Sequence, residues 1–154
     1  MIETLTIQRF RGIRECVFQN LGKVNLILGG NNAGKTAVLD ALEFLARDGH
    51  PAALSGIAAR RSGEKDTLGE TLPSGVQYLF YQGEKSFFLE SEGTFQRSIL
   101  ATLHDLSEQF QRENIGRIEL IRNGQKAETY AYGEVLHNST SPRIGSPIKV
   151  QMIL

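Results

Sequence analysis

The sequence predicts an α/β fold whose second half is β-rich and antiparallel, and two features of the chain predict it. A nearly continuous apolar run at residues 23–30 leads into a glycine-rich loop and then an amphipathic stretch, in the order strand, loop, helix. From residue 76 onward, strand-like runs alternate with glycine-containing turns. The chain has 154 residues, of which 40% are hydrophobic and 22% charged. We therefore expect a single domain over residues 1–154.

The first part of this domain, residues 1–50, is predicted to hold a hairpin, a strand and a helix. "IETLTIQ" and "ECVFQNL" flank the turn-like pair Arg11-Gly12, which indicates an N-terminal hairpin. "KVNLILGG" is apolar on both faces, as in central parallel strands, so we expect it to be a buried strand. The helix that follows should end near Gly49 and Pro51. Its apolar positions are Val38, Leu39, Ala41, Leu42, Leu45 and Ala46.

The remaining residues are predicted to form a loop and then strands. Residues 51–75 are rich in Gly, Ser and charge, which indicates a surface excursion with a short helix near 57–61, and the basic "AARRSGEK" within it is expected to be solvated. In residues 76–154 the strand-like runs are "GVQYLFYQG", "KSFFLES", "TFQRSILATL", "RIELIRNG" and "AETYAYGE". Helical spacing over residues 99–112 competes with this interpretation, and we favour a strand to about Leu103 and a short helix after it. Asn123-Gly124 is typical of a hairpin turn.

The charge, the apolar runs and the cysteine count of the chain bear on which classes of function are expected. Seventeen basic and seventeen acidic residues give a net charge of zero, so no overall field recruits nucleic acid or an acidic membrane. No run approaches the roughly 20 apolar residues of a membrane span. Cys16 is the single cysteine and cannot form an internal disulfide, which favours a reducing, cytoplasmic setting.

The segment from Gly29 to Thr36 matches the pattern G-x-x-x-x-G-K-[ST] in full. Gly29 and Gly34 let the backbone turn tightly, so that consecutive N–H groups can point at an anion. The Lys35 ammonium is suited to the β and γ phosphates of a nucleotide, and the Thr36 hydroxyl to a Mg²⁺ ion. A helix that starts here adds the positive end of its dipole. The sequence therefore predicts a nucleotide-binding Walker A loop.

Residues 1–45 resemble the amino-terminal lobe of the ABC-type ATPases related to SMC, RecF and the OLD (overcoming lysogenization defect) proteins. The resemblance lies in "IETLTIQRFRGIRE", "VNLILGGNNAGKT" and "AVLDALEFL", and "LFYQGEKSFFLES" is similar to the β segment that bacterial AAA/OLD-like ATPases carry after their first helix. It implies a P-loop fold and an ATP site. The resemblance places Arg11 near the nucleotide, whereas the residues alone also allow a solvated turn arginine. The phosphate-holding residues that it implies are Asn31, Asn32, Ala33, Gly34, Lys35, Thr36 and Ala37.

Hydrolysis in this family needs more than the loop. An acidic Walker B pair orders Mg²⁺ and polarises the attacking water, and a serine-glycine signature from a second subunit neutralises the γ phosphate. The sequence contains no apolar run that ends in Asp-Glu, and it ends on the apolar "PIKVQMIL". We therefore expect an incomplete ATPase that depends on a carboxy-terminal lobe or a partner subunit. The resemblance also implies a head-to-head dimer and, by family analogy alone, a DNA partner in repair or phage defence.

Two alternatives stay open at this point. A non-hydrolysing nucleotide-sensing or dimerisation module would also lack Walker B residues, but it should be monodisperse, whereas an isolated lobe would expose apolar surface and aggregate. A small GTPase would need D-x-x-G and N-K-x-D. Residues 66–69, "DTLG", fit the first pattern, and the second is absent.

Overall fold

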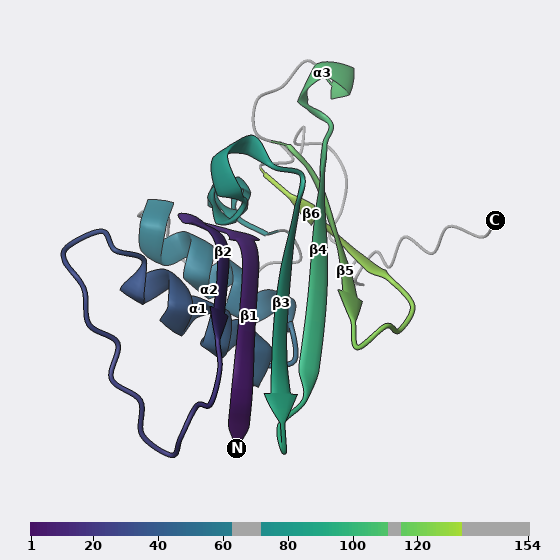
Figure 1. The fold of residues 1–154 in the computed structure, drawn as a ribbon. Helices are drawn as coiled ribbons and strands as arrows, with labels where there is room; N and C mark the ends of the chain where they lie inside the picture. The colour runs from purple at the N-terminus through teal and green to yellow at the C-terminus, as the bar shows by residue number, and fades with distance from the viewer. Residues whose placement is uncertain (63–71, 111–114, 134–154) are drawn as a thin grey trace.

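The strands of this protein form one antiparallel sheet in the order β2-β1-β3-β4-β5-β6, seen in a computed structural model that describes residues 1–62, 72–110 and 115–133 (Figure 1). The strands are β1 Ile2–Phe10, β2 Ile13–Phe18, β3 Ser86–Gly93, β4 Arg97–Asp105, β5 Gly116–Arg122 and β6 Glu128–Tyr132. The α-helices are α1 Lys35–Ala46, α2 Pro51–Ser62 and α3 Ser107–Phe110, and the 3-10 helices are η1 Ser74–Leu79 and η2 Tyr81–Gly83. The predicted mixture of helix and antiparallel sheet is confirmed at this level.

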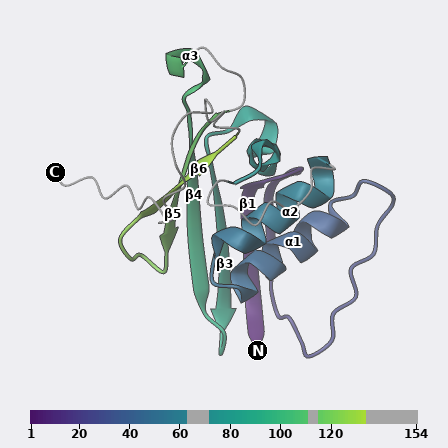
Figure 2. The same ribbon diagram turned by 180° about the vertical axis from the view of Figure 1, so that it is seen from behind.

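The core lies between one face of the sheet and helices α1 and α2, which lie in front of the strands in Figure 2. Alternate residues of each central strand point into this core, as Leu5 and Ile7 do in β1 and Phe87 and Leu89 in β3. Phe87 is the centre of an aromatic cluster, with its ring 4.9 Å from Phe10, 5.1 Å from Phe80 and 6.3 Å from Phe44 between centroids. The end of β1 is thereby fixed against α1 and the segment after η1.

The predicted N-terminal hairpin is confirmed. Strands β1 and β2 pair antiparallel with Phe10 opposite Ile13, so Arg11 and Gly12 form the turn. Arg11 takes a left-handed backbone conformation with φ of 54°, which is uncommon for a residue with a side chain. Cys16 lies in β2, half-buried, as a small thiol in a strand.

The predicted buried strand at residues 23–30 is wrong. Residues 19–34 form neither helix nor strand, and Figure 1 shows that this segment extends away from the sheet and the helices. Val24 is 90% exposed and Leu26 and Leu28 are each 80% exposed. The physical reason is that a strand is stable only when its backbone is hydrogen-bonded to a neighbouring strand. Within the described residues, no strand is paired with residues 23–30.

The helix after the glycine-rich loop is confirmed as α1, which ends before Gly49 with φ of 66°. The short helix expected near 57–61 is confirmed as part of helix α2, but the surface excursion predicted around it is wrong over residues 51–62, because the helix already begins at Pro51. Pro51 occupies its first turn, where a missing N–H costs nothing, and the exposed His50 caps it by accepting a hydrogen bond from the Ala52 N–H at Nδ1, 3.2 Å away. One apolar face packs into the core; its residues are Ala53, Leu54, Ile57 and Ala58. Residues 63–71 lie outside the described part.

In the second half, four of the five predicted strands are confirmed as β3 to β6, with the turn at Asn123 and Gly124 between β5 and β6. The strand-then-helix interpretation of residues 99–112 is confirmed by β4 and α3 as far as residue 110. The predicted strand "GVQYLFYQG" is wrong, because it forms η1 and η2. Its buried positions Val76, Leu79 and Phe80 are spaced three and four apart, which suits a helical turn. The terminal "PIKVQMIL" lies outside the described residues.

Candidate functional site

The glycine-rich loop, residues 29–36, runs directly into the N-terminus of α1. Gly34 precedes the helix with φ of 87°, a conformation that glycine adopts without strain, and Asn32 is also left-handed with φ of 63°. The Val38 N–H donates to the Gly34 carbonyl over 3.1 Å, which closes the first helical turn. The first turn carries no acidic side chain, so nothing within it compensates the positive end of the helix dipole. The local geometry therefore favours an anion at this helix end.

Lys35 folds back over the loop that precedes it. Its Nζ donates to the carbonyl oxygens of Gly29, at 2.7 Å, and Gly30, at 2.6 Å. Neutral carbonyls are weaker acceptors for an ammonium group than charged oxygens are. A phosphate presented to the loop would therefore compete well for the same amine.

A hollow of about 820 Å³ opens beside the loop. The residues that line it come from three parts of the chain: the β1–β2 turn, the loop with the start of α1, and η1. They are Arg11, Gly12, Asn31, Asn32, Ala33, Gly34, Lys35, Thr36, Ala37 and Tyr78. The structure thus brings Arg11 together with residues 31–37, while Gly29 is not among the lining residues and contacts Lys35 through its carbonyl.

Arg11 is not a solvated turn residue, because only 8% of it is exposed. Its Nη1 forms an ion pair with the Oδ2 of Asp40, a helix α1 residue that is itself 5% exposed. Its backbone N–H donates to the Leu79 carbonyl over 2.8 Å. Its Nη2 is buried without a hydrogen-bond partner among the described residues. Arg11 is therefore a buried cation that joins the hairpin turn to α1 and η1 at the wall of the hollow.

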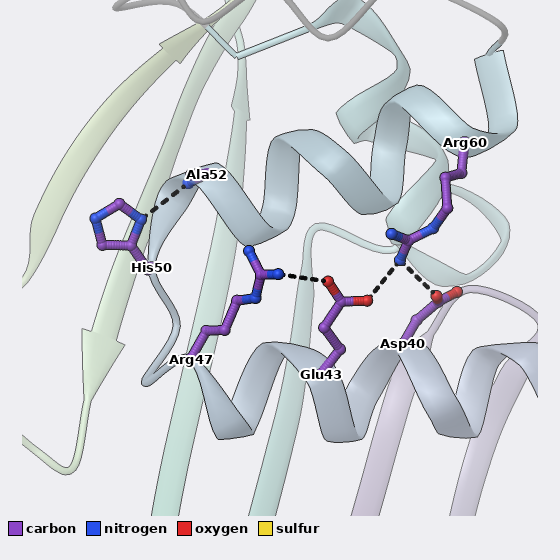
Figure 3. Close-up of polar contacts among 6 residues, drawn as sticks. All are labelled: Asp40, Glu43, Arg47, His50, Ala52 and Arg60. Atoms are coloured by element: carbon purple, nitrogen blue, oxygen red, sulfur yellow. Dashed lines mark hydrogen bonds and ion pairs between the residues drawn. The ribbon is translucent and has the colours of Figure 1, made fainter.

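A second arginine reaches the same carboxylate from helix α2. Figure 3 shows Arg60 extending toward α1, where its Nη2 donates to Asp40 Oδ1 at 3.1 Å and to Glu43 Oε2 at 2.7 Å. Glu43 also forms an ion pair with Arg47, four residues further along the chain, with 3.5 Å between Glu43 Oε1 and Arg47 Nη2. Arg60, part of the basic cluster expected in a solvated loop, lies instead on a helix. Its side chain is 53% exposed and joins α2 to α1 through these ion pairs.

The comparison with known families agrees with this arrangement. The sequence profile of the AAA ATPase domain matches residues 1–129, well over half of the chain. The chain belongs to the AAA ATPase domain family. The resemblance to the amino-terminal lobe of an AAA/SMC-like P-loop ATPase is confirmed at this level, and membership supports nucleotide binding of the ATPase type.

A relative of this AAA ATPase domain is an uncharacterized protein of Methanocaldococcus jannaschii, with 57% identity over 42 residues. The matched stretch is 27% of this chain and only 19% of that protein. The likeness is therefore strong but local, and the relative's full length extends far beyond the part that it shares with this chain.

Few of the side chains at the hollow of this AAA ATPase domain could bind a metal ion. Thr36 is exposed in the first turn of α1 and lines the hollow, so its hydroxyl is free to meet a cation there. Asp40, one turn further on, is already paired with Arg11 and Arg60. Over residues 1–62, 72–110 and 115–133, no three His, Cys, Asp or Glu residues gather as a metal cluster. A Mg²⁺ ion would suit this site only with oxygens supplied by a bound phosphate, which is how proteins commonly hold it.

Sequence reasoning found the loop and Arg11 but missed Asp40, Arg60 and Tyr78. Asp40 lies on α1 among apolar residues, a position at which a charge is rarely buried unless it is paired. That signal was present in the sequence, but its partners lie 29 residues before it and 20 residues after it. Tyr78 belongs to a segment that the sequence predicted as a strand.

The helices in the described part of the chain are all too short or too polar to cross a membrane.

Proposed function

We propose that this chain binds ATP with Mg²⁺ through a Walker A loop, as the amino-terminal lobe of an OLD/SMC-like ATPase. The observation that carries the proposal is the hollow in which the loop residues 31–37, the N-terminus of α1 and Arg11 meet. Lys35 would exchange its loop carbonyls for β and γ phosphate oxygens, and Thr36 would contribute its hydroxyl to Mg²⁺. The loop N–H groups and the helix dipole would hold the remaining phosphate charge.

Turnover, in this proposal, depends on residues beyond the described site. The residues that line the hollow present cations, amides and a hydroxyl, and Asp40, which pairs with Arg11 of this lining, is engaged by two arginines. A group that polarises the attacking water would come from a second lobe or subunit. The exposed Val24, Leu26 and Leu28 directly before the loop support such an arrangement, because a second lobe packed against them would remove their apolar surface from water. A role in DNA repair or phage defence rests on family analogy, and it is a proposal for the whole protein.

The test is isothermal titration of the chain with Mg-ATP. Lys35→Ala removes the ammonium group from the phosphate site, and charge-assisted hydrogen bonds of this kind are worth about 1.5–3 kcal/mol each, so affinity should fall by roughly tenfold or more. Lys23→Ala is the matched control, because Lys23 is an exposed lysine on the same segment that does not line the hollow. Equal affinity of wild type and Lys35→Ala would refute the phosphate-loop assignment.

A further inference from the structure

Tyr78 has an unusual position for a large aromatic residue. It belongs to η1, whose neighbouring side chains Val76 and Leu79 are fully buried, yet 66% of Tyr78 is exposed. It lines the hollow together with the loop residues 31–37. Because its ring contributes little to the core, it is available for contact with a ligand in the hollow.

The position of Tyr78 is fixed by its neighbours. The next residue, Leu79, accepts a hydrogen bond at its carbonyl from the Arg11 N–H, and Phe80 forms a β-bridge with Phe10. Arg11 is in turn held by its ion pair with Asp40 on α1. The backbone that carries Tyr78 is thus joined to the hairpin turn and, through Arg11, to the helix that begins at the loop. A ligand held by the loop would meet a tyrosine whose backbone is already in place.

We propose that the Tyr78 ring receives the base of the bound nucleotide by stacking, while residues 31–37 hold the phosphates. This inference rests on the proposed function. A hollow of about 820 Å³ is far larger than a triphosphate needs and lies in the range of sites for whole nucleotide-sized ligands. A tyrosine presents a π face that any base can cover, and it loses little conformational freedom on binding.

The experiment compares a ligand that carries a nucleoside with one that consists of the phosphates alone. Mg-ATP and Mg-tripolyphosphate are titrated into the wild-type chain and into Tyr78→Ala, Tyr78→Phe, Tyr81→Ala and Lys35→Ala. Base–aromatic stacking predicts that Tyr78→Ala weakens ATP binding by about fivefold or more and leaves tripolyphosphate binding unchanged. Tyr78→Phe keeps the ring and should bind ATP within about twofold of wild type. Tyr81→Ala is the matched control, because Tyr81 lies three residues away and is not among the residues that line the hollow.

The outcomes separate this inference from the proposed function. If Tyr78→Ala binds ATP as wild type does, or weakens ATP and tripolyphosphate equally, base stacking on Tyr78 is refuted. A loss that Tyr78→Phe shares with Tyr78→Ala would refute it as well, because the ring would then not be the active group. If Lys35→Ala binds both ligands as wild type does, the phosphate site itself is refuted. Thermal melting of each variant identifies any that lose affinity by unfolding.

Discussion

Asp40 is a buried carboxylate held between two arginines with different environments. Arg11 is nearly as buried as Asp40, whereas the side chain of Arg60 is 53% exposed. Removing one partner of a buried pair leaves an uncompensated charge out of water, while exposed pairs contribute little because water screens them. The ion pair between Arg11 and Asp40 should therefore contribute more to the free energy of unfolding than the ion pairs of Arg60 do.

We expect Asp40→Asn to lower the free energy of unfolding by about 3–5 kcal/mol, the usual cost of breaking a buried pair. Asparagine keeps the shape of the side chain but leaves the Arg11 guanidinium without its counter-charge. The measurement is urea unfolding followed by circular dichroism, with the midpoint compared at constant slope. The same reasoning predicts that Arg11→Ala destabilises the fold as well as weakening nucleotide binding.

Glu43→Gln is the matched control for Asp40→Asn. Glu43 also pairs with Arg60, but both side chains are partly exposed, so the change should cost no more than about 1 kcal/mol. Equal losses in the two variants would contradict the assignment of the buried pair as the dominant contact.

Single residues differ in how far the sequence reveals them. Lys35 and Thr36 follow from a contiguous pattern whose chemistry is local, so no tertiary information is needed. Asp40 and Tyr78 gain their roles only through contacts with the β1–β2 turn and η1, which are distant in sequence. The roles of such residues can be recognised only when the folded structure shows which segments lie together.

At the scale of elements, the segment 19–34 combines an apolar sequence with an exposed backbone. The apolar pattern of residues 23–30 is that of a buried strand, and α1 directly after the loop is anchored by Val38, Ala41 and Leu45 in the core. The segment is therefore held at its start, where the Leu21 N–H donates to the Glu3 carbonyl, and at its end by α1, whereas residues 23–30 between them belong to no strand of the sheet. Extended chains of this kind pair readily with an added strand.

We expect the backbone amides of residues 23–30 to exchange with solvent far faster than those of β1. Strand β1 is paired on both sides, by β2 and β3, so its amides open only with the sheet. Hydrogen exchange read by mass spectrometry on peptides from the two segments compares them within one sample. Strong protection of residues 23–30 in the isolated chain would show that they already pair with another strand and would overturn this description.

The elements that sequence reasoning predicted correctly are those with local signals. The turns at Arg11-Gly12 and Asn123-Gly124 carry their own turn chemistry, and α1 carries a helical apolar face. Helix α2 was predicted only in part, near residues 57–61, because its alanine-rich, glycine-containing sequence is weakly apolar. Its packing against η1 and α1 shows what its full length buries. The strand at 23–30 was mispredicted because strand formation depends on a neighbour that the sequence pattern cannot supply.

At the scale of the whole molecule, apolar side chains are exposed next to the candidate site. Val24, Leu26 and Leu28 precede the loop, and Leu39, 60% exposed, follows it on α1. Exposed apolar surface of this kind favours association in water.

We therefore expect the isolated chain to self-associate, and we expect the double variant Leu26→Ser, Leu28→Ser to shift it toward monomer. The physical reason is that these side chains can remove apolar surface from water only by contact with another molecule. Size-exclusion chromatography with light scattering, run over a dilution series, measures the effect. Val17→Ser is the control, because Val17 is an exposed aliphatic residue on β2, outside this segment. A wild-type chain that stays monodisperse and monomeric would instead favour a self-sufficient nucleotide-binding module, since no partner lobe would then be needed to cover residues 23–30.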